Sequence, residues 1–197
     1  MSATRLLVLG VVRMRGKAHG YQVRRELLTW KADEWANAQP GSIYHALKQM
    51  AKEGLLEAEA DNEPGRTAYR LTQDGEIQFQ VLLAGMLSTP DDSNQDAYGL
   101  AAAVTFMTAL PRATAISLLQ HRLTELDGHH ANVASVLKRG SDWGQPEHLN
   151  ELFRLWCAQL DATARWATDL IKRLEGGEYV MADEAEDHFG HPAIKLD

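Results

Sequence analysis

The sequence predicts a mainly α-helical protein with a small two-stranded β hairpin, and three observations predict this fold class. Apolar residues recur at spacings of three and four over most of the 197 residues, which is the period of an amphipathic helix. Residues 56–61 instead alternate acidic residues with alanine, which is the period of a half-exposed strand. A Pro64-Gly65 turn then leads to a second expected strand at 67–72.

Composition is that of an ordinary globular protein, with 45% hydrophobic and 24% charged residues. The single cysteine, Cys157, excludes an internal disulfide and a cysteine-based zinc site, and it fits a reducing compartment. The apolar run Leu6–Val12 is interrupted by Gly10 and ends in basic residues, unlike a signal peptide. No apolar stretch approaches the ~20 residues of a membrane-spanning helix. We therefore expect a cytoplasmic protein without a membrane partner.

Charge is distributed unevenly along the chain, whose formal net charge is −7. Residues 1–85 hold 11 basic and 10 acidic residues, whereas residues 86–197 hold 9 and 17. The first 31 residues are the most basic, with seven Lys or Arg and one acidic residue. A basic N-terminal module on an acidic remainder favours nucleic-acid binding at that end, through a local patch.

The segment from Gln39 to Leu71 organises the rest of the prediction. Pro40 suits the first turn of a helix and Gly54 suits the residue after its end. One face of this helix is apolar, with Ile43, Leu47 and Met50. The opposite face carries polar side chains: Ser42, His45, Lys48, Gln49 and Lys52. A helix with one buried and one donor-rich face, followed by a hairpin, is the layout of a recognition helix and wing in a winged helix-turn-helix domain.

Other helices are expected on both sides of this unit. The first two helices are expected at 4–15 and 21–33, with a turn around Gly20 between them. A polar connection from 31 to 39 follows. Thr72 is expected to cap a fourth helix after the wing. That helix carries Ile77, Val81, Leu82 and Met86.

The polar segment 88–95 is the best candidate for a domain boundary. Beyond it, an apolar segment at 98–110, a heptad seam over 113–138 and a wide apolar face over 147–174 predict helices. The last two helices present more apolar surface than they can bury against each other, so a second helix pair is expected to cover them. The expected division is a DNA-binding domain at 1–88, a helical dimerisation and effector domain at 96–175, and a flexible acidic tail at 176–197.

Short motifs run in fixed order through the first 85 residues: Leu6–Gly10, His19-Gly20-Tyr21, Pro40–Tyr44, Ala46-Leu47, Glu53-Gly54-Leu55, Arg66, Tyr69, Leu71-Thr72 and Gly75. In this order and spacing they resemble the PadR family of bacterial transcriptional regulators. The resemblance implies a homodimer whose C-terminal helices pair across a two-fold axis, with one winged domain on each operator half-site. It also implies repression that a small molecule relieves in many members. The sequence departs from the family pattern at Gln39, where a small residue is common, and in its acidic wing.

Eight residues are candidates for DNA contact: Gln39, Ser42, Tyr44, His45 and Lys48 in and before the recognition helix, Arg66 in the wing, and Lys17 and Tyr21 near the first turn. A helix N-terminus offers N–H groups to phosphate, hydroxyl and imidazole groups reach phosphate or base edges, and lysine neutralises phosphate. Two alternatives stay open. Packing of Tyr44 against the wing is as plausible as DNA contact, and packing at the start of the second helix is the favoured role of Tyr21.

Four aromatic residues of the C-terminal part are candidates for a cavity that binds a small aromatic effector: Tyr98, Phe153, Trp156 and Trp166. At helical spacing such residues are more often plain core, and that interpretation is favoured. The histidines at 129–130, 188 and 191 lack carboxylate or thiolate support, so neither a metal site nor another cofactor is expected. His130 lies on the heptad seam, where a hydrogen-bonded interface histidine is expected.

The sequence contains no glycine-rich phosphate loop and no nucleophile motif, so an enzyme is not expected. The expected function is that of a DNA-binding transcriptional regulator, a repressor that binds double-stranded DNA at a palindromic operator as a homodimer and is released by a small molecule. The alternative is a winged-helix protein-interaction module without sequence-specific DNA binding, which the acidic wing favours.

Overall fold

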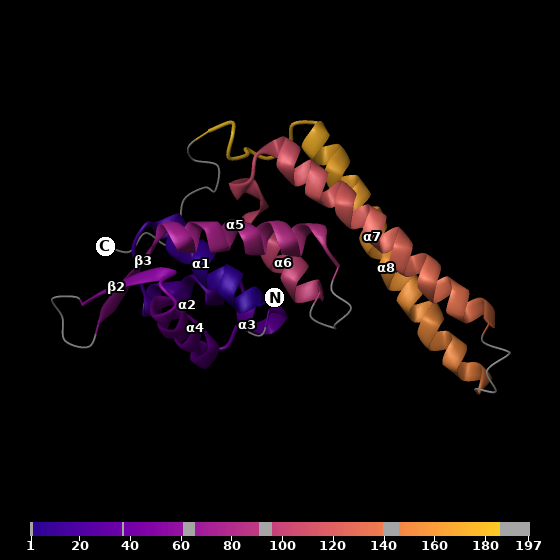
Figure 1. The fold of residues 1–197 in the computed structure, drawn as a ribbon, viewed down its shortest axis with the longest axis horizontal. Coiled ribbons are helices and arrows are strands. Elements are labelled where there is room, and N and C mark those ends of the chain that lie inside the picture. Colours follow the sequence, from indigo (N-terminus) through magenta and orange to yellow (C-terminus); the bar gives the residue numbers. More distant parts are fainter. Residues whose placement is uncertain (1, 37, 61–65, 91–95, 140–145, 186–197) are drawn as a thin grey trace.

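A globular N-terminal part and a long helical hairpin make up the molecule (Figure 1). The computed structural model describes residues 2–36, 38–60, 66–90, 96–139 and 146–185. The elements in chain order are α1 (Ala3–Arg15), β1 (Ala18–His19), α2 (Gly20–Thr29), α3 (Ala32–Trp35), α4 (Pro40–Lys52), β2 (Leu56–Ala60), β3 (Thr67–Leu71), α5 (Gln73–Ser88), α6 (Asp96–Phe106), the 3-10 turn η1 (Met107–Ala109), α7 (Arg112–Arg139), the 3-10 turn η3 (Glu147–Leu149) and α8 (Asn150–Glu175). The predicted fold class, a mainly helical winged helix-turn-helix protein with a helical C-terminal part, is confirmed.

The sheet has one strand more than the sequence predicted. The described strands pair antiparallel in the order β1-β3-β2, with Ala18 opposite Tyr69 and Ala58 opposite Tyr69 on its other side. The two-residue strand β1 lies where the sequence predicted only a turn, because two residues are too short to show a period. Its backbone ties the start of α2 to the wing.

The connection before α4 also differs from the prediction. Helix α2 ends at Thr29, Lys31 adopts a left-handed conformation with φ 55°, and the short helix α3 follows. The Trp35 side chain fixes this bend by donating from Nε1 to the Trp30 carbonyl at 2.8 Å. A single helical turn with a polar composition carries no readable apolar period, so the sequence indicated only a polar linker.

Helix boundaries around the wing follow the predicted signals. Pro40 occupies the first turn of α4, and Gly54 lies just beyond its end with φ 77°. Thr72 caps α5, since its Oγ1 accepts from the Gly75 N–H at 3.0 Å. Of the apolar residues expected in α5, Leu82 and Met86 are buried, whereas Ile77 and Val81 are 55% and 57% exposed.

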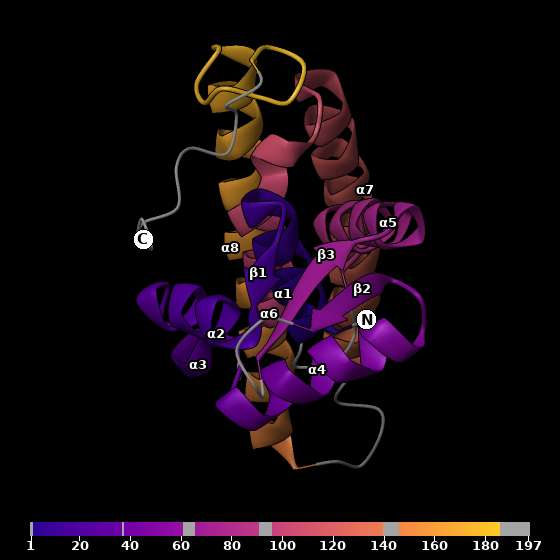
Figure 2. The same ribbon diagram turned by 90° about the vertical axis from the view of Figure 1, so that its left-hand side faces the viewer.

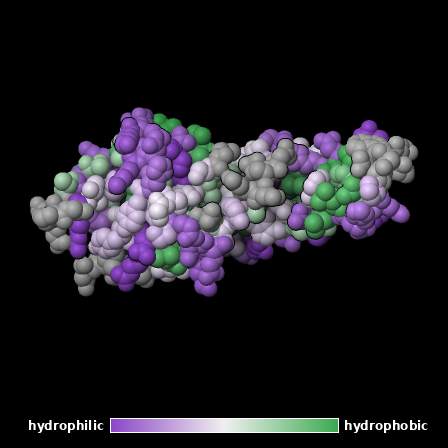
Figure 3. All heavy atoms as spheres, turned by 90° about the horizontal axis from the view of Figure 1, so that it is seen from below, coloured by the Kyte–Doolittle hydropathy of each residue, from purple (hydrophilic) through white to green (hydrophobic). Residues whose placement is uncertain are grey.

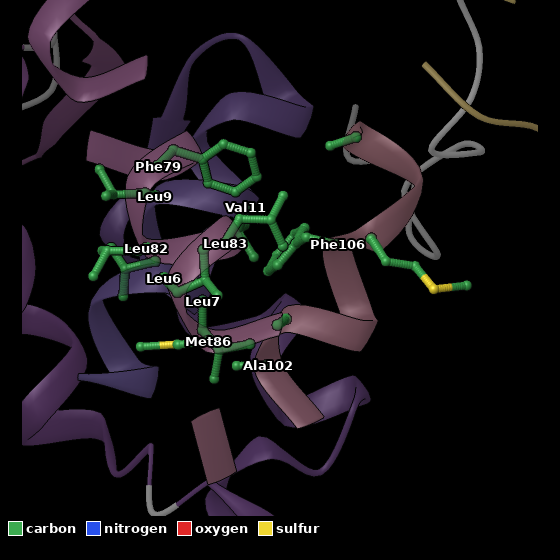
Figure 4. Close-up of a cluster of buried hydrophobic side chains, with 14 of the residues drawn as sticks. Leu6, Leu7, Leu9, Val11, Phe79, Leu82, Leu83, Met86, Ala102 and Phe106 are labelled. Atoms are coloured by element: carbon green, nitrogen blue, oxygen red, sulfur yellow. The ribbon is translucent and has the colours of Figure 1, made fainter. Parts of the chain in front are cut away.

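One hydrophobic core runs through the globular part and across the predicted boundary at 88–95. Helix α1 lies at its centre and buries every residue from Leu6 to Val12. Helix α6 closes this core, because Phe106 packs edge-on against Phe79 (Figure 4) and also against Trp30. The core continues into the hairpin, where Leu119 and Leu174 are fully buried. Residues 91–95 of the predicted boundary lie outside the described residues.

The heptad seam of α7 faces α8, and the two helices lie side by side along the hairpin (Figure 1). His130 takes part in this contact, since its Nε2 lies 3.4 Å from an Asp161 carboxylate oxygen. At the base of the hairpin, the buried Arg122 donates to the carbonyls at the end of α5: Met86 at 2.8 Å, Leu87 at 2.9 Å and Thr89 at 3.1 Å. A cation at a helix C-terminus is electrostatically favourable. Arg122 therefore fastens the hairpin to the globular part.

The first part of the expected flexible tail is packed against the molecule. Met181 is fully buried, and the Ala182 N–H donates to the Leu110 carbonyl at 3.3 Å. Arg112 holds the segment with its guanidinium group, which donates to the carbonyls of Leu174, Glu178 and Tyr179 and to the Glu184 carboxylate. Residues 178–184 of the expected tail therefore pack against the rest of the molecule, and residues 186–197 lie outside the described residues.

Candidate nucleic-acid interface

The polar face of α4 is presented to solvent as the sequence predicted. His45 and Lys48 are both exposed, and their spacing of three places them on one side of the helix. The apolar face points inward, with Ile43, Leu47 and Met50 fully buried. Figure 2 shows α4 lying along one side of the globular part, next to α2 and below the sheet.

The start of α4 is held by its own polar residues. The Ser42 hydroxyl donates to the Gln39 carbonyl at 2.7 Å, and the Gln39 side-chain amide donates to the Asp33 carbonyl at 3.3 Å. Gln39 is exposed and Ser42 is half-buried. Both side chains therefore stabilise the entry into α4 and remain accessible to a ligand at its N-terminus, where backbone N–H groups favour an anion.

Tyr44 packs against the start of α2. A Cβ added at Gly20 would lie 2.6 Å from the Tyr44 ring, so the ring lies directly over the Gly20 backbone. This contact explains why a glycine occupies position 20: any larger residue would displace Tyr44. The side chain keeps 39% of its surface exposed. Tyr44 therefore joins α4 to α2 and reaches the surface beside His45.

Tyr21 packs on the residue that precedes α2 and also reaches the surface. Its side chain is 44% exposed and its ring stacks on His19 with centroids 5.7 Å apart. The Arg66 guanidinium carbon lies 5.7 Å from the Tyr21 ring centroid. The two candidates are brought together, and Arg66 is exposed. A cation over an aromatic face is a weakly stabilising contact.

Lys17 is engaged by the acidic wing. Its ammonium group makes an ion pair with the Glu59 carboxylate of β2, and both side chains remain partly exposed. The Lys17 hydrogen bond and charge, with the charge of Arg70, hold the pKa of Glu59 below its ordinary value. Glu59 is therefore charged at neutral pH and competes for a cation that the sequence assigned to phosphate.

Arg24 and Arg25 of α2 are further candidates for DNA contact, and no motif in the sequence marks them individually. Both are exposed, and together with Tyr21, Leu28 and Thr29 they line an open hollow in the surface. The basic excess of the first 31 residues was the available signal, but it did not distinguish these arginines from structural ones. Arg15 shows the difference, because it forms a 2.6 Å ion pair with the buried carboxylate of Glu26.

The four effector candidates do not share one cavity in this chain. Phe153 and Trp156 pack edge-on with ring centroids 5.5 Å apart, and Trp156 is 42% exposed. Trp166 is half-buried against the core ten residues further along α8, which is about 15 Å along a helix. Tyr98 lies on α6 and is exposed. Of the four candidates, only Phe153 and Trp156 therefore contact each other.

Within the described ranges, no group of three or more His, Cys, Asp or Glu side chains is placed to hold a metal ion. Cys157 is half-buried on α8. The part of the chain that the structure describes also contains no helix that is both long enough and apolar enough to span a membrane.

A model of the transcriptional regulator PadR-like family matches residues 8–81. Solved structures are similar at low identity. PadR from Bacillus subtilis in complex with operator DNA is 18% identical, with 86% of this chain and 98% of that chain covered and a TM-score of 0.38. A PadR-like transcriptional regulator from Bacillus cereus is 18% identical, with coverages of 89% and 99% and a TM-score of 0.37.

A third similar structure is Bacillus subtilis PadR in complex with p-coumaric acid. It is 16% identical, with 88% of this chain and 99% of that chain covered and a TM-score of 0.37. None of the curated proteins matches the chain. The family match covers α2, α4 and the whole wing, which are the elements that carry the candidate interface. Residues 8–81 of this chain therefore form a winged helix-turn-helix domain of the transcriptional regulator PadR-like family.

Proposed function

We propose that the protein is a transcriptional repressor that binds a palindromic operator as a homodimer, with α4 of each subunit in the major groove. The observation that carries the proposal is the exposed polar face of α4. The opposite, apolar face of this helix is fully buried in the core. A helix held in this way is rigid and presents donors to a groove that admits one helix.

In this proposal the candidate residues divide into two kinds of contact. His45 contacts base edges, because an imidazole donates to or accepts from the major-groove edge. Lys48, Arg66, Tyr21 and the N–H groups at the start of α4 contact phosphates and set the orientation of the domain. Gln39, Ser42 and Tyr44 fix the helix start and reach the same surface. The DNA-contacting surface then lies within 1–88.

The dimer interface is proposed for the C-terminal part, 96–175. Four exposed apolar residues near the beginning of α8 support it: Leu149, Leu152, Leu155 and Trp156. Figure 3 shows hydrophobic side chains gathered toward the far end of the hairpin. Burying one such side chain contributes roughly 1.5–3 kcal/mol, so several favour association over exposure to water. A second copy offers a matching patch by two-fold symmetry.

A small aromatic effector is proposed to bind beside Phe153 and Trp156, within or next to this interface. Their edge-on pair presents a partly exposed indole to a planar apolar compound. Such a compound changes operator affinity only if it binds two arrangements of the hairpins with different affinity. The rigid attachment of α7 to α5 through Arg122 would carry a change at the hairpin to the winged domain.

Selection of bound sequences from a random duplex library tests the proposal. The wild type should enrich a two-fold symmetric sequence whose half-sites are about one helical turn apart, roughly 34–36 Å. The His45→Ala variant should fold and still bind DNA, but its base preference should be relaxed at one position of each half-site. A library that shows no enrichment, with wild type and His45→Ala indistinguishable, would favour the protein-interaction module instead.

A further inference from the structure

The outer face of the three-stranded sheet carries a paired set of charges that DNA recognition by α4 does not use. Cross-strand partners share a face of a sheet, so Glu57 lies with its partner Arg70, and Glu59 lies in one row with Ala68 and His19. Lys17 precedes β1 and lies two residues before His19. Its ion pair with Glu59 therefore spans the central strand β3.

The position of Lys17 places it beside the candidate DNA surface. His19, two residues further on, stacks on Tyr21, and Tyr21 lies under the Arg66 guanidinium. Lys17 is thus at the edge of a group of residues proposed to contact phosphate. Its side chain is 46% exposed, and its ammonium group is held toward Glu59 of β2, on the wing.

Glu59 remains ionised under the conditions in which DNA binds. The hydrogen bond and charge of Lys17 hold its pKa below the ordinary value. A carboxylate and a phosphate are alternative anionic partners for the same ammonium group, and only one can be contacted closely at a time. Because the Lys17–Glu59 pair is exposed, its own stability is small and a phosphate can compete with it.

We propose that Glu59 is an electrostatic brake on DNA binding: its carboxylate occupies Lys17 and withholds one phosphate contact from the duplex. The proposal rests on the proposed DNA-binding function and adds a regulatory contact to it. It also accounts for an acidic strand in the wing of a DNA-binding domain. The brake acts on the backbone contact, so it lowers affinity for every sequence rather than selecting among sequences.

Glu59→Gln tests the brake, because glutamine keeps the shape of the side chain and removes its charge. Binding of the full-length protein to a random-sequence duplex is measured by fluorescence anisotropy over a series of salt concentrations. Glu59→Gln should bind about two- to fivefold more tightly at low salt. Its plot of log affinity against log salt should be steeper by about 0.9, the value for one added phosphate contact.

Two comparisons separate this effect from a change in net charge. Glu178→Gln removes the same charge from an exposed position beyond α8, and it should leave affinity and salt slope at the wild-type values. In a Lys17→Ala background, Glu59→Gln should give no gain, because the cation that it releases is absent.

The proposal is overturned if Glu59→Gln gains no more affinity than Glu178→Gln, or if its gain survives in the Lys17→Ala background. A wild type that binds the duplex normally under either result leaves the proposed function standing. If neither the wild type nor Glu59→Gln binds DNA in a salt-dependent way, both the brake and the proposed function are wrong.

Discussion

At Gly10 the missing side chain lets α6 close against α1. A Cβ there would lie 2.2 Å from the Phe106 ring, which is itself buried between Phe79 and Trp30. The sequence showed Gly10 only as an interruption of an apolar run, because the residue that needs the space is 96 positions away in the chain. Gly54 and Thr72 were predictable by contrast, because each affects only the helix end next to it in the sequence.

Gly10→Ala should destabilise the protein by about 1–3 kcal/mol, the usual cost of inserting a methyl group into a filled core. Gly128→Ala is the matched control, since position 128 is also inside a helix but a Cβ there meets nothing within 4 Å. That variant should be more stable than wild type by about 0.5–1 kcal/mol. Urea denaturation measures both, and equal stability of the two variants would show that α6 does not pack on Gly10.

Among elements, those with a long period or a clear cap were predictable and those set by distant contacts were not. Helices α4, α7 and α8 and strands β2 and β3 follow from their own sequences. Strand β1 exists through its pairing with β3, and the segment 178–184 is ordered by Arg112. The acidic composition after residue 176 indicated a free tail, because composition does not reveal that Arg112 binds Glu184 and three backbone carbonyls of this region.

The docking of segment 178–184 against the rest of the molecule should depend on pH, because it uses the Glu184 carboxylate. Arg112 lowers the pKa of Glu184 to about 2, so its carboxylate stabilises the docked segment fully above about pH 4.5. This contribution is lost as pH falls toward 2 and the carboxylate takes up a proton. Amide exchange of Ala182 should therefore lose protection across that range. In Glu184→Gln the protection should already be low at neutral pH, while amides of α4 keep theirs. Full protection of Ala182 in this variant would contradict the assigned role of the ion pair.

At the scale of the whole molecule, the hairpin leaves apolar surface uncovered far from the winged domain. The sequence predicted this from the width of the apolar face over 147–174, and the exposure of Leu152 and Trp156 agrees with it. The sequence did not predict that one core would extend to both sides of the segment 88–95. Phe106 and Arg122 make this connection through contacts with residues far away in the sequence. Nor did the sequence place the candidate aromatic residues, of which only Phe153 and Trp156 meet.

Leu152→Glu should produce a monomer with weakened operator binding, because it places a charge in the proposed interface. Helicity by circular dichroism should be retained, since Leu152 is already 41% exposed in the single chain. Thr168→Glu is the control: it adds the same charge at an exposed position on the other side of α8. Sedimentation equilibrium reports the outcome. A Leu152→Glu protein that remains dimeric would move the interface elsewhere.

The central claim is that the exposed face of α4 binds the DNA backbone and grooves, and the salt dependence of Lys48→Ala tests it most directly. Lys52→Ala is the matched control, because Lys52 is exposed at the far end of the same helix and is expected to face solvent. Lys48→Ala should bind operator and random DNA more weakly, with a salt slope shallower by about one unit. Lys52→Ala should match the wild type. If Lys48→Ala keeps the wild-type affinity and slope on both duplexes, α4 is not the recognition helix.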